Sequence, residues 1–367
     1  MSRKEDVEAA LLRLRPVVNE ALSDVVDGSP PEQLTNASQH LIDAGGKRLR
    51  PVILLLAAEA VADRHVSDGT DGDATAGDDP GSRLPEIPDD PSDYRQFPAA
   101  DGRGVDVLTA AACIEVVHTF SLIHDDILDD DDVRRGVPAV HQQYGDEMAI
   151  LAGDKLFARS FELLLETGAS PANSVPALGM LSRTCVKLCE GEGLDISFED
   201  RDGVSVPEYL QMVDLKTGVL FAATASIPAV VLGHKEAVDP LAGYGREVGR
   251  AFQIKDDLLD LTASTEALGK QRGSDLVEGK QTIVTAHARE QGIDVDNLVE
   301  SETLEEVTED EIDDAVEQLE DAGSIAYARD MARDCVERGK EHLSALPDTR
   351  PRQLLTDIAE HLVEREK

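Results

Sequence analysis

Tryptophan is absent from the 367-residue chain, and aromatic residues make up only 3% of it. Lysine is also scarce, with 11 among the 35 Lys and Arg residues, which face 74 Asp and Glu. The net charge of −39 disfavours nucleic acids and anionic membrane surfaces as partners, because both are polyanions. The hydrophobic content of 41% is close to that of ordinary globular proteins, so the acidity does not indicate a disordered chain.

A folded chain that is acidic and poor in lysine needs another explanation. This composition is typical of proteins that stay soluble in concentrated salt, where screening removes the repulsion between like charges. We therefore expect a halophilic protein. Its folded state should depend on salt, because the surplus carboxylates repel one another when they are not screened.

Cysteine is nearly absent as well, and the few cysteines form no CxxC pair. Their apolar surroundings predict reduced, buried side chains, as in cytoplasmic proteins. The four are Cys113, Cys185, Cys189 and Cys335. The N-terminal residues are charged rather than apolar, and no uninterrupted apolar run reaches the length of a membrane span. The sequence thus predicts a cytoplasmic protein without stable membrane insertion.

Strand-like alternation is missing over any appreciable length, whereas apolar residues recur at helical spacing through most of the chain. Leu41 and Ile42, followed by two glycines, predict a helix with a glycine stop. Residues 308–311 (TEDE) form a capping box before another helix. We expect one all-α domain over residues 1–367, with ten or more helices that can enclose a cavity.

One segment departs from this pattern. From about residue 67 to residue 101 the chain is rich in Gly, Pro and Asp and poor in apolar residues. Such a segment cannot bury enough apolar surface to offset the entropy of ordering it. It is predicted to be a solvated acidic loop inserted in the domain.

Two similar aspartate motifs lie far apart in the chain. The first begins at His124 as HDDILDDDDVRRG, and the second begins at Phe252 as FQIKDDLLD. Each contains DDxxD, whose four-residue spacing places the first and last aspartates on one helix face. The flanking residues are apolar enough to be buried, and buried carboxylates are costly without cations. The motifs therefore predict two carboxylate sites for Mg²⁺, which completes its shell with water and phosphate oxygens.

Positive residues are concentrated around these motifs. The segment GGKRLRP at 45–51 carries three of them, and Arg134 and Arg135 follow the first aspartates. Five of the 11 lysines fall in these short stretches, namely Lys47, Lys216, Lys255, Lys270 and Lys280. Carboxylates that bind metal, with Lys and Arg around them, suit two diphosphates: one bridged by Mg²⁺ and one held directly by side chains.

Five motifs stand in the order seen in trans-isoprenyl diphosphate synthases: GGKRLRP, LIHDDILD with RRG, KTG, FQIKDDLLD, and GK with GSDLVEGK. The chain resembles this family from about residue 11 to residue 362, and it looks like a geranylgeranyl diphosphate synthase of a halophilic archaeon. The resemblance implies helices around a deep central cavity, usually in a homodimer. It also implies condensation of isopentenyl diphosphate with dimethylallyl, geranyl or farnesyl diphosphate to geranylgeranyl diphosphate, through ionisation, attack and proton loss.

The resemblance implies a role for each motif residue. Two or three Mg²⁺ ions would be held chiefly by Asp125, Asp129 and Asp256, supported by Asp126, Asp257 and Asp260. The allylic diphosphate would contact Arg134, Lys216, Lys270 and Lys280, with Thr217 and Gln253 near the nascent cation. Isopentenyl diphosphate would contact Lys47, Arg50, His118 and Arg135. The catalytic candidates are Asp125, Asp129, Asp256, Lys216 and Arg134.

Two of these positions follow from spacing as well. His118 precedes Asp125 by seven residues, which is two helical turns, so both lie on one helix face. Periodicity also places Ser121 on this face and turns Phe120 away from it. The role of Phe120 as the floor that limits product length therefore rests on the resemblance, in which one aromatic residue at this position is typical of twenty-carbon synthases.

Several alternatives stay open. The product could have fifteen or twenty-five carbons instead of twenty. Terpene cyclases and head-to-head synthases also use aspartate-rich helices, but they do not need Lys47, Arg50 and His118 for a second diphosphate. A non-catalytic subunit of a heteromeric synthase would be expected to have lost one aspartate motif, and a purely structural acidic protein would show no effect of mutating Asp256.

Overall fold

The computed structural model describes residues 3–26, 28, 30–62, 92–199, 201, 203–263, 271–299, 301, 303 and 306–364. These residues divide into two compact units, each built from three stretches of sequence. Unit 1 comprises Met1–Arg183, Ala223–Ala242 and Ser344–Asp357, and unit 2 comprises Thr184–Ala222, Gly243–Leu343 and Ile358–Lys367. The single domain expected over residues 1–367 stays a prediction.

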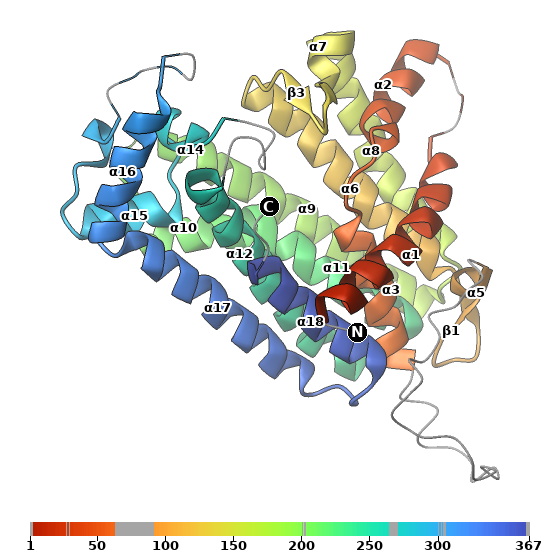
Figure 1. The fold of residues 1–367 in the computed structure, drawn as a ribbon. Helices are drawn as coiled ribbons and strands as arrows, with labels where there is room; N and C mark the ends of the chain where they lie inside the picture. The colour runs from red at the N-terminus through yellow and green to blue at the C-terminus, as the bar shows by residue number, and fades with distance from the viewer. Residues whose placement is uncertain are drawn as a thin grey trace. The chain divides into compact units, whose positions relative to one another are not determined.

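Helices dominate the described residues of both units (Figure 1). The described strands are two residues long each and form two antiparallel pairs, β1 with β2 and β3 with β4. The prediction of an all-α protein with ten or more helices is therefore confirmed within the described residues.

Unit 1 is organised around α6 (Val107–Leu128), which packs against α3 (Leu49–Ala62) and α8 (Asp146–Glu166). Both α3 and α6 are apolar along most of their length, so the core covers most of their residues. The other helices of this unit are α1 (Arg3–Ser23), α2 (Glu32–Asp43), α5 (Ser92–Arg95), α7 (Val140–Tyr144) and the 3₁₀ turn η2 (Lys235–Ala237). Its strands are β1 (Phe97–Pro98), β2 (Gly104–Val105), β3 (Val133–Arg134) and β4 (Val137–Pro138).

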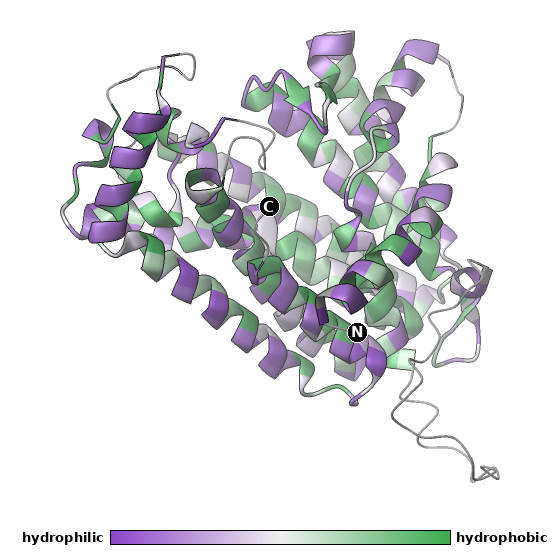
Figure 2. Cartoon of the chain, viewed as in Figure 1, coloured by the Kyte–Doolittle hydropathy of each residue, from purple (hydrophilic) through white to green (hydrophobic). Residues whose placement is uncertain are grey.

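Unit 2 contains α17 (Ser324–Leu343), which packs against α15 (Ile283–Glu290) and α16 (Glu309–Asp321). Hydrophobic and hydrophilic residues alternate along α16 and α17 at helical spacing, as expected for helices with one buried face (Figure 2). The capping box predicted at 308–311 is confirmed at the start of α16. The remaining elements are α10 (Val206–Val213), the π-helix η1 (Asp214–Gly218), α14 (Ser274–Val277) and the 3₁₀ turn η3 (Val295–Asn297).

Some long helices contribute residues to both units. They are α9 (Pro171–Glu199), α11 (Val219–Leu232), α12 (Val238–Thr262) and α18 (Arg350–Glu364). Two described segments, Val107–Leu128 and Val206–Leu232, are long and apolar enough to cross a membrane. They are respectively 72% and 89% buried, however, as the core helices of a globular fold are.

The acidic loop predicted at about 67–101 requires a partial correction. Residues 63–91 lie outside the described residues, but residues 92–98 contain α5 and β1 instead of a solvated loop. Tyr94 is completely buried and its hydroxyl donates to Glu59 of α3, while its ring stacks on Phe97. These two aromatic rings anchor the end of the segment in the core of unit 1, so composition alone misplaced its boundary.

The cysteines also need one correction. Cys113, Cys185 and Cys335 are buried thiols as predicted, but Cys189 is exposed. It lies on α9 one helical turn after Cys185, so the apolar sequence around it did not reveal its exposure. All four cysteines are free thiols.

Candidate active site

The first aspartate motif lies at the end of α6, behind an almost uninterrupted apolar sequence. Asp125 is partly buried in the last turn, and Asp129, one turn further on, is an exposed cap residue. The spacing therefore places these two carboxylates in successive turns, as predicted. Asp126, in contrast, points into the protein and is completely buried.

Asp126 is paired with an arginine of the adjacent hairpin. Its Oδ1 accepts a hydrogen bond of 2.6 Å from Nε of Arg134, whose Nη2 also binds Asp131 at 2.6 Å. Burial raises the pKa of Asp126, although the Arg134 guanidinium acts in the opposite direction. Its other oxygen, Oδ2, is buried and accepts no hydrogen bond from the described residues. Arg134 is thus fixed at the first motif, where it bridges Asp126 and the partly exposed Asp131.

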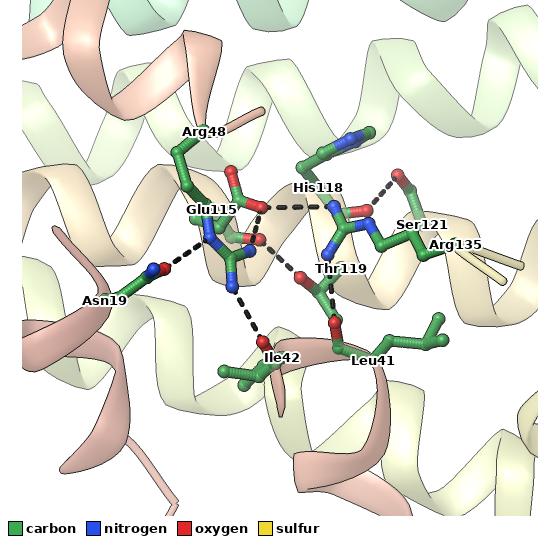
Figure 3. A network of polar contacts seen from close by, with 9 residues as sticks. All are labelled: Asn19, Leu41, Ile42, Arg48, Glu115, His118, Thr119, Ser121 and Arg135. Atoms are coloured by element: carbon green, nitrogen blue, oxygen red, sulfur yellow. Dashed lines mark hydrogen bonds and ion pairs between the residues drawn. The ribbon is translucent and has the colours of Figure 1, made fainter. Parts of the chain in front are cut away.

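A second polar network lies one to three turns earlier on α6 (Figure 3). Glu115 is buried, and its Oε1 accepts from Nη1 of Arg48 at 2.5 Å and from Nη2 of Arg135 at 3.1 Å. Arg48 also donates to the side chain of Asn19 and to the carbonyl of Ile42. The two arginines belong to the motifs GGKRLRP and RRG, so the structure brings these two motifs together on α6.

His118 follows Glu115 by one helical turn and has arginines on several sides. Burial and the charges of Arg50, Arg135, Arg134 and Arg48 hold the pKa of its imidazole well below the usual range. His118 is consequently neutral near pH 7. A neutral imidazole among guanidinium groups can offer one hydrogen bond to an anion without adding a further buried charge.

The second aspartate motif lies on α12 in unit 2 and repeats the division into inner and outer carboxylates. Asp257 is buried and accepts hydrogen bonds from the Tyr209 hydroxyl, from Nε2 of Gln253 at 3.1 Å and from the Ile283 amide at 3.3 Å. Burial raises the pKa of its carboxyl to about 7. Asp256, the preceding residue, is only partly buried.

Asp260 is almost completely buried at the next turn of α12. Its Oδ1 accepts from Oγ of Ser274 at 2.9 Å, and its Oδ2 accepts from the amide of Asp275 at 3.1 Å. These bonds tie α12 to the start of α14. Both buried carboxylates of this motif are therefore bound by donors of the protein itself.

Lys216 and Thr217 lie on the π-helix η1, which interrupts the regular path between α10 and α11. The ammonium of Lys216 pairs with Asp195 at 2.6 Å and with Glu192 at 3.0 Å, both on α9. At Gly191 a Cβ atom would stand 2.3 Å from the Lys216 backbone nitrogen, so only glycine allows α9 to approach η1 this closely. A backbone contact thus fixes where the lysine is placed.

Thr217 is connected to the second aspartate motif by side chains. Its hydroxyl donates to Oε1 of Gln253 at 3.0 Å, and Gln253 in turn donates to Asp257. A Cβ at Gly249 would stand 2.9 Å from the Cα of Gly218, so two glycines bring η1 and α12 into contact. The structure thus brings together Thr217 and Gln253, both of which the resemblance to the family places near the nascent cation.

The remaining predicted cations have different positions. Lys47 is exposed in the loop before α3, and Arg50 lies half-buried in the first turn of that helix, close enough for its charge to lower the pKa of His118. Lys280 pairs with Glu278 at 3.3 Å in unit 2. Lys270 lies outside the described residues.

Phe120 packs away from the aspartate face, as its periodicity predicts. Its ring is 8% exposed and meets the ring of Phe157 on α8 edge-on, with 5.3 Å between the centroids. The hydroxyl of Ser121 donates to the carbonyl of His118 at 2.9 Å. Phe120 and Phe157 form an aromatic pair one to two turns before the first aspartates.

Sequence reasoning did not find every residue of these networks. Arg48 lies within GGKRLRP but has no predicted role, and Glu115 and Tyr209 lie outside the five motifs. A lone glutamate in the apolar stretch of α6 was the available signal for Glu115, because a buried carboxylate requires a cation. No local signal marks Tyr209, which lies 48 residues from its partner Asp257.

The donors around the first motif fit a hard metal ion only in part. Among the residues that the structure describes, no three His, Cys, Asp or Glu side chains converge on one point that could hold a metal. The available groups are carboxylate oxygens, including the unpartnered Oδ2 of Asp126. An ion bound here would need water or phosphate oxygens to complete its shell, which is how Mg²⁺ binds in proteins.

Comparison with known proteins agrees with these features. Residues 31–319 match the model of the polyprenyl synthetase family. The chain is 54% identical to a geranylfarnesyl diphosphate synthase from Natronomonas pharaonis, over 100% of this chain and 99% of that protein. This relative extends the likeness across both units and both aspartate motifs.

Solved structures show the same fold. A geranylgeranyl pyrophosphate synthetase from Geoglobus acetivorans superimposes with a TM-score of 0.78 at 39% identity, covering 96% of this chain and 98% of that one. A polyprenyl synthase from Caulobacter crescentus, in complex with calcium and isoprenyl diphosphate, gives 0.76 at 31% identity, with 98% of each chain covered. The chain therefore belongs to the polyprenyl synthetase family and is a trans-isoprenyl diphosphate synthase, a prenyltransferase that acts on isoprenoid diphosphates.

Proposed function

We propose that the protein condenses isopentenyl diphosphate with allylic diphosphates to give geranylgeranyl diphosphate, with Mg²⁺ as its cofactor. The observation that carries this proposal is the placement of His118, Arg50 and Arg135 together on one side of unit 1, near a carboxylate motif. That cluster suits a second diphosphate, which a terpene cyclase does not bind. The order of the family's motifs and the fold shared with its members support the condensation of isoprenoid diphosphates.

The metal would be held at each aspartate motif, by Asp125 and Asp129 in unit 1 and by Asp256 in unit 2. When bound, Mg²⁺ supplies charge that makes diphosphate a better leaving group. Asp126 holds Arg134 beside the first motif, and Asp257 holds Gln253 and Tyr209 behind the second. These side chains are fixed before substrate arrives, so little reorganisation is needed as charge develops.

An assay of product length tests the proposal directly. The purified protein is incubated in concentrated KCl with Mg²⁺, labelled isopentenyl diphosphate and each allylic primer in turn. We expect twenty-carbon diphosphate from every primer and loss of activity when EDTA removes the metal. Absence of label in any prenyl product, with all three primers, would contradict the proposed function.

A twenty-five-carbon product is the second candidate. It is favoured by the 54% identical relative, which is named as a geranylfarnesyl diphosphate synthase. The aromatic pair of Phe120 and Phe157 supports the shorter product, because two rings packed together leave little room for a growing chain between α6 and α8. The same assay distinguishes the two products by chain length.

Replacing Phe120 by alanine should lengthen the product by at least one five-carbon unit. The change removes the ring that meets Phe157 and frees the volume that this ring fills beside α8. Product length is measured by reversed-phase chromatography after dephosphorylation. Leu12→Ala, which truncates an exposed apolar residue of α1, should leave the product unchanged. An unaltered product from Phe120→Ala would remove this residue from the control of chain length.

Replacing Glu192 by glutamine should lower KM for the allylic primer by about threefold to tenfold. Lys216 is shared between Glu192 and Asp195, and removing one of these charges leaves the ammonium freer to bind a diphosphate. Steady-state kinetics with geranyl diphosphate measure the change. Glu190→Gln, two residues earlier on α9 and exposed, is the matched control. A raised or unchanged KM in Glu192→Gln would show that this pair does not compete with substrate.

We also propose that the protein forms a homodimer and works in the cytoplasm of a halophile. The exposed apolar side chains Ile150, Leu151, Phe157 and Leu165 on α8 support a subunit interface, because such residues are costly to leave in water. The free thiols support a reducing compartment, and the net charge of −39 supports a salt-rich one. Light scattering in concentrated KCl tests the oligomeric state.

A further inference from the structure

Glu115 is a buried carboxylate that serves two arginines at once. One of its oxygens, Oε1, accepts from both Arg48 and Arg135, at 2.5 and 3.1 Å (Figure 3). The side chains of Glu115 and Arg48 are 3% and 2% exposed, and that of Arg135 is 15% exposed. The pairing therefore lies inside the protein, where replacing one partner leaves the other charge without compensation.

Both arginines have an unusual backbone conformation. Within the described parts of the chain, the non-glycine residues with positive φ are Arg48 at 53°, Arg135 at 54° and Asp130 at 55°. Arg135 and Gly136 form the two-residue turn between β3 and β4, a turn in which both central residues require positive φ. The backbone of a non-glycine residue is strained at positive φ, and this conformation persists only where the surrounding contacts hold it.

Further contacts hold the two guanidinium groups to the end of α2 and to the loop before α3. Arg48 donates to the carbonyl of Ile42 at 2.7 Å, and Arg135 donates to that of Leu41 at 2.9 Å. At Gly46 a Cβ atom would stand 3.2 Å from Cζ of Arg135, so the loop lies against the flat face of this guanidinium. Through these contacts, Glu115 joins three segments: helix α6, the glycine loop and the β3–β4 turn.

Each of these segments carries a group assigned above to isopentenyl diphosphate. Helix α6 carries His118, the glycine loop carries Lys47 and leads into Arg50, and the turn carries Arg135. These groups belong to three different segments. Their positions relative to one another therefore depend on the contacts between the segments. The Glu115 carboxylate is the group to which both arginine-bearing segments bind on α6.

We propose that Glu115 is a positioning residue for the non-allylic diphosphate, an inference that rests on the proposed function. It fixes the guanidinium of Arg135 and the loop of Lys47 and Arg50 around His118. It also balances one of two buried positive charges, so that Arg48 and Arg135 lie side by side before any anion binds. The expected ligand of the group is the diphosphate of isopentenyl diphosphate, and the allylic substrate is bound elsewhere.

Glu115→Gln tests this inference because it preserves the size of the side chain and removes its charge. We expect KM for isopentenyl diphosphate to rise at least tenfold, while KM for geranyl diphosphate changes less than threefold. Slow hydrolysis of geranyl diphosphate in the absence of isopentenyl diphosphate should also continue at the wild-type rate. A merely structural role would alter all three quantities together.

Two further variants make the result decisive. Glu162→Gln removes the carboxylate of an exposed pair with Arg159, at 3.1 Å on α8, and should leave every parameter unchanged. Gly46→Ala places a methyl group against the Arg135 guanidinium from an exposed loop, and it should raise the same KM even if Glu115→Gln does not fold. Wild-type KM for isopentenyl diphosphate in Glu115→Gln, or in Gly46→Ala where Glu115→Gln does not fold, would overturn the inference. Failure of the wild-type enzyme to incorporate isopentenyl diphosphate would instead overturn the proposed function.

Discussion

Replacing Asp256 by alanine is expected to lower turnover by about 10²–10³-fold or more, the usual cost of removing one group that stabilises charge in a transition state. Asp256 is the partly buried member of the second motif, whereas Asp257 and Asp260 bond to protein donors behind it. In the proposed function the Asp256 carboxylate is a ligand for Mg²⁺, and alanine supplies no oxygen in its place. Initial rates with labelled isopentenyl diphosphate, at saturating Mg²⁺ and primer, measure the loss.

The control for this experiment lies on the same helix. Asp239→Ala changes an exposed aspartate in the first turn of α12 and should retain full activity. Binding of isopentenyl diphosphate to Asp256→Ala should also be retained, because the residues assigned to that ligand belong to unit 1. Turnover within threefold of wild type in Asp256→Ala would contradict a catalytic second motif and leave it a structural one.

Replacing Asp257 by alanine should destabilise the protein, lowering its free energy of unfolding by about 3–5 kcal/mol. The buried carboxylate accepts from Tyr209, Gln253 and the Ile283 amide, and truncation leaves these donors without an acceptor and opens a cavity. Urea unfolding at constant KCl, followed by circular dichroism, measures the difference. This effect on stability separates Asp257 from Asp256, whose mutation should affect catalysis first.

Asp330 provides the comparison for Asp257. It is exposed on α17 and pairs with Arg333 at 3.3 Å, so Asp330→Ala should cost less than about 1 kcal/mol. Asp257→Asn keeps one acceptor oxygen, so its free energy of unfolding should lie between those of Asp257→Ala and Asp330→Ala. Equal stability of Asp257→Ala and Asp330→Ala would show that the hydrogen bonds around Asp257 contribute little.

The parts of the fold that were predicted correctly are those with local signals. The helix ending before Gly45 and the capping box at Thr308 are each determined by a few neighbouring residues. The boundary of the acidic loop was missed because Tyr94 depends on Glu59, a residue 35 positions earlier. Composition within the segment contains no information about such a distant partner.

The candidate site shows the same division. Helical periodicity correctly placed Asp125 and Asp129 in successive turns and turned Phe120 away from them. Periodicity could not show that Asp126 faces Arg134, because a hairpin turn determines the position of the arginine. The contacts of Glu115 were likewise hidden, since they join segments that are distant in sequence and bend through positive φ angles.

The π-helix at Asp214–Gly218 determines which way the side chains of α10 point relative to those of α11. A π-turn accommodates one more residue than a regular turn, and each residue advances an α-helix by roughly 100°. Tyr209 precedes the π-helix and Thr217 lies within it, yet both residues bind α12. Tyr209 donates to Asp257, and Thr217 donates to Gln253. Deleting one residue here should therefore break one of the two contacts while the other is kept.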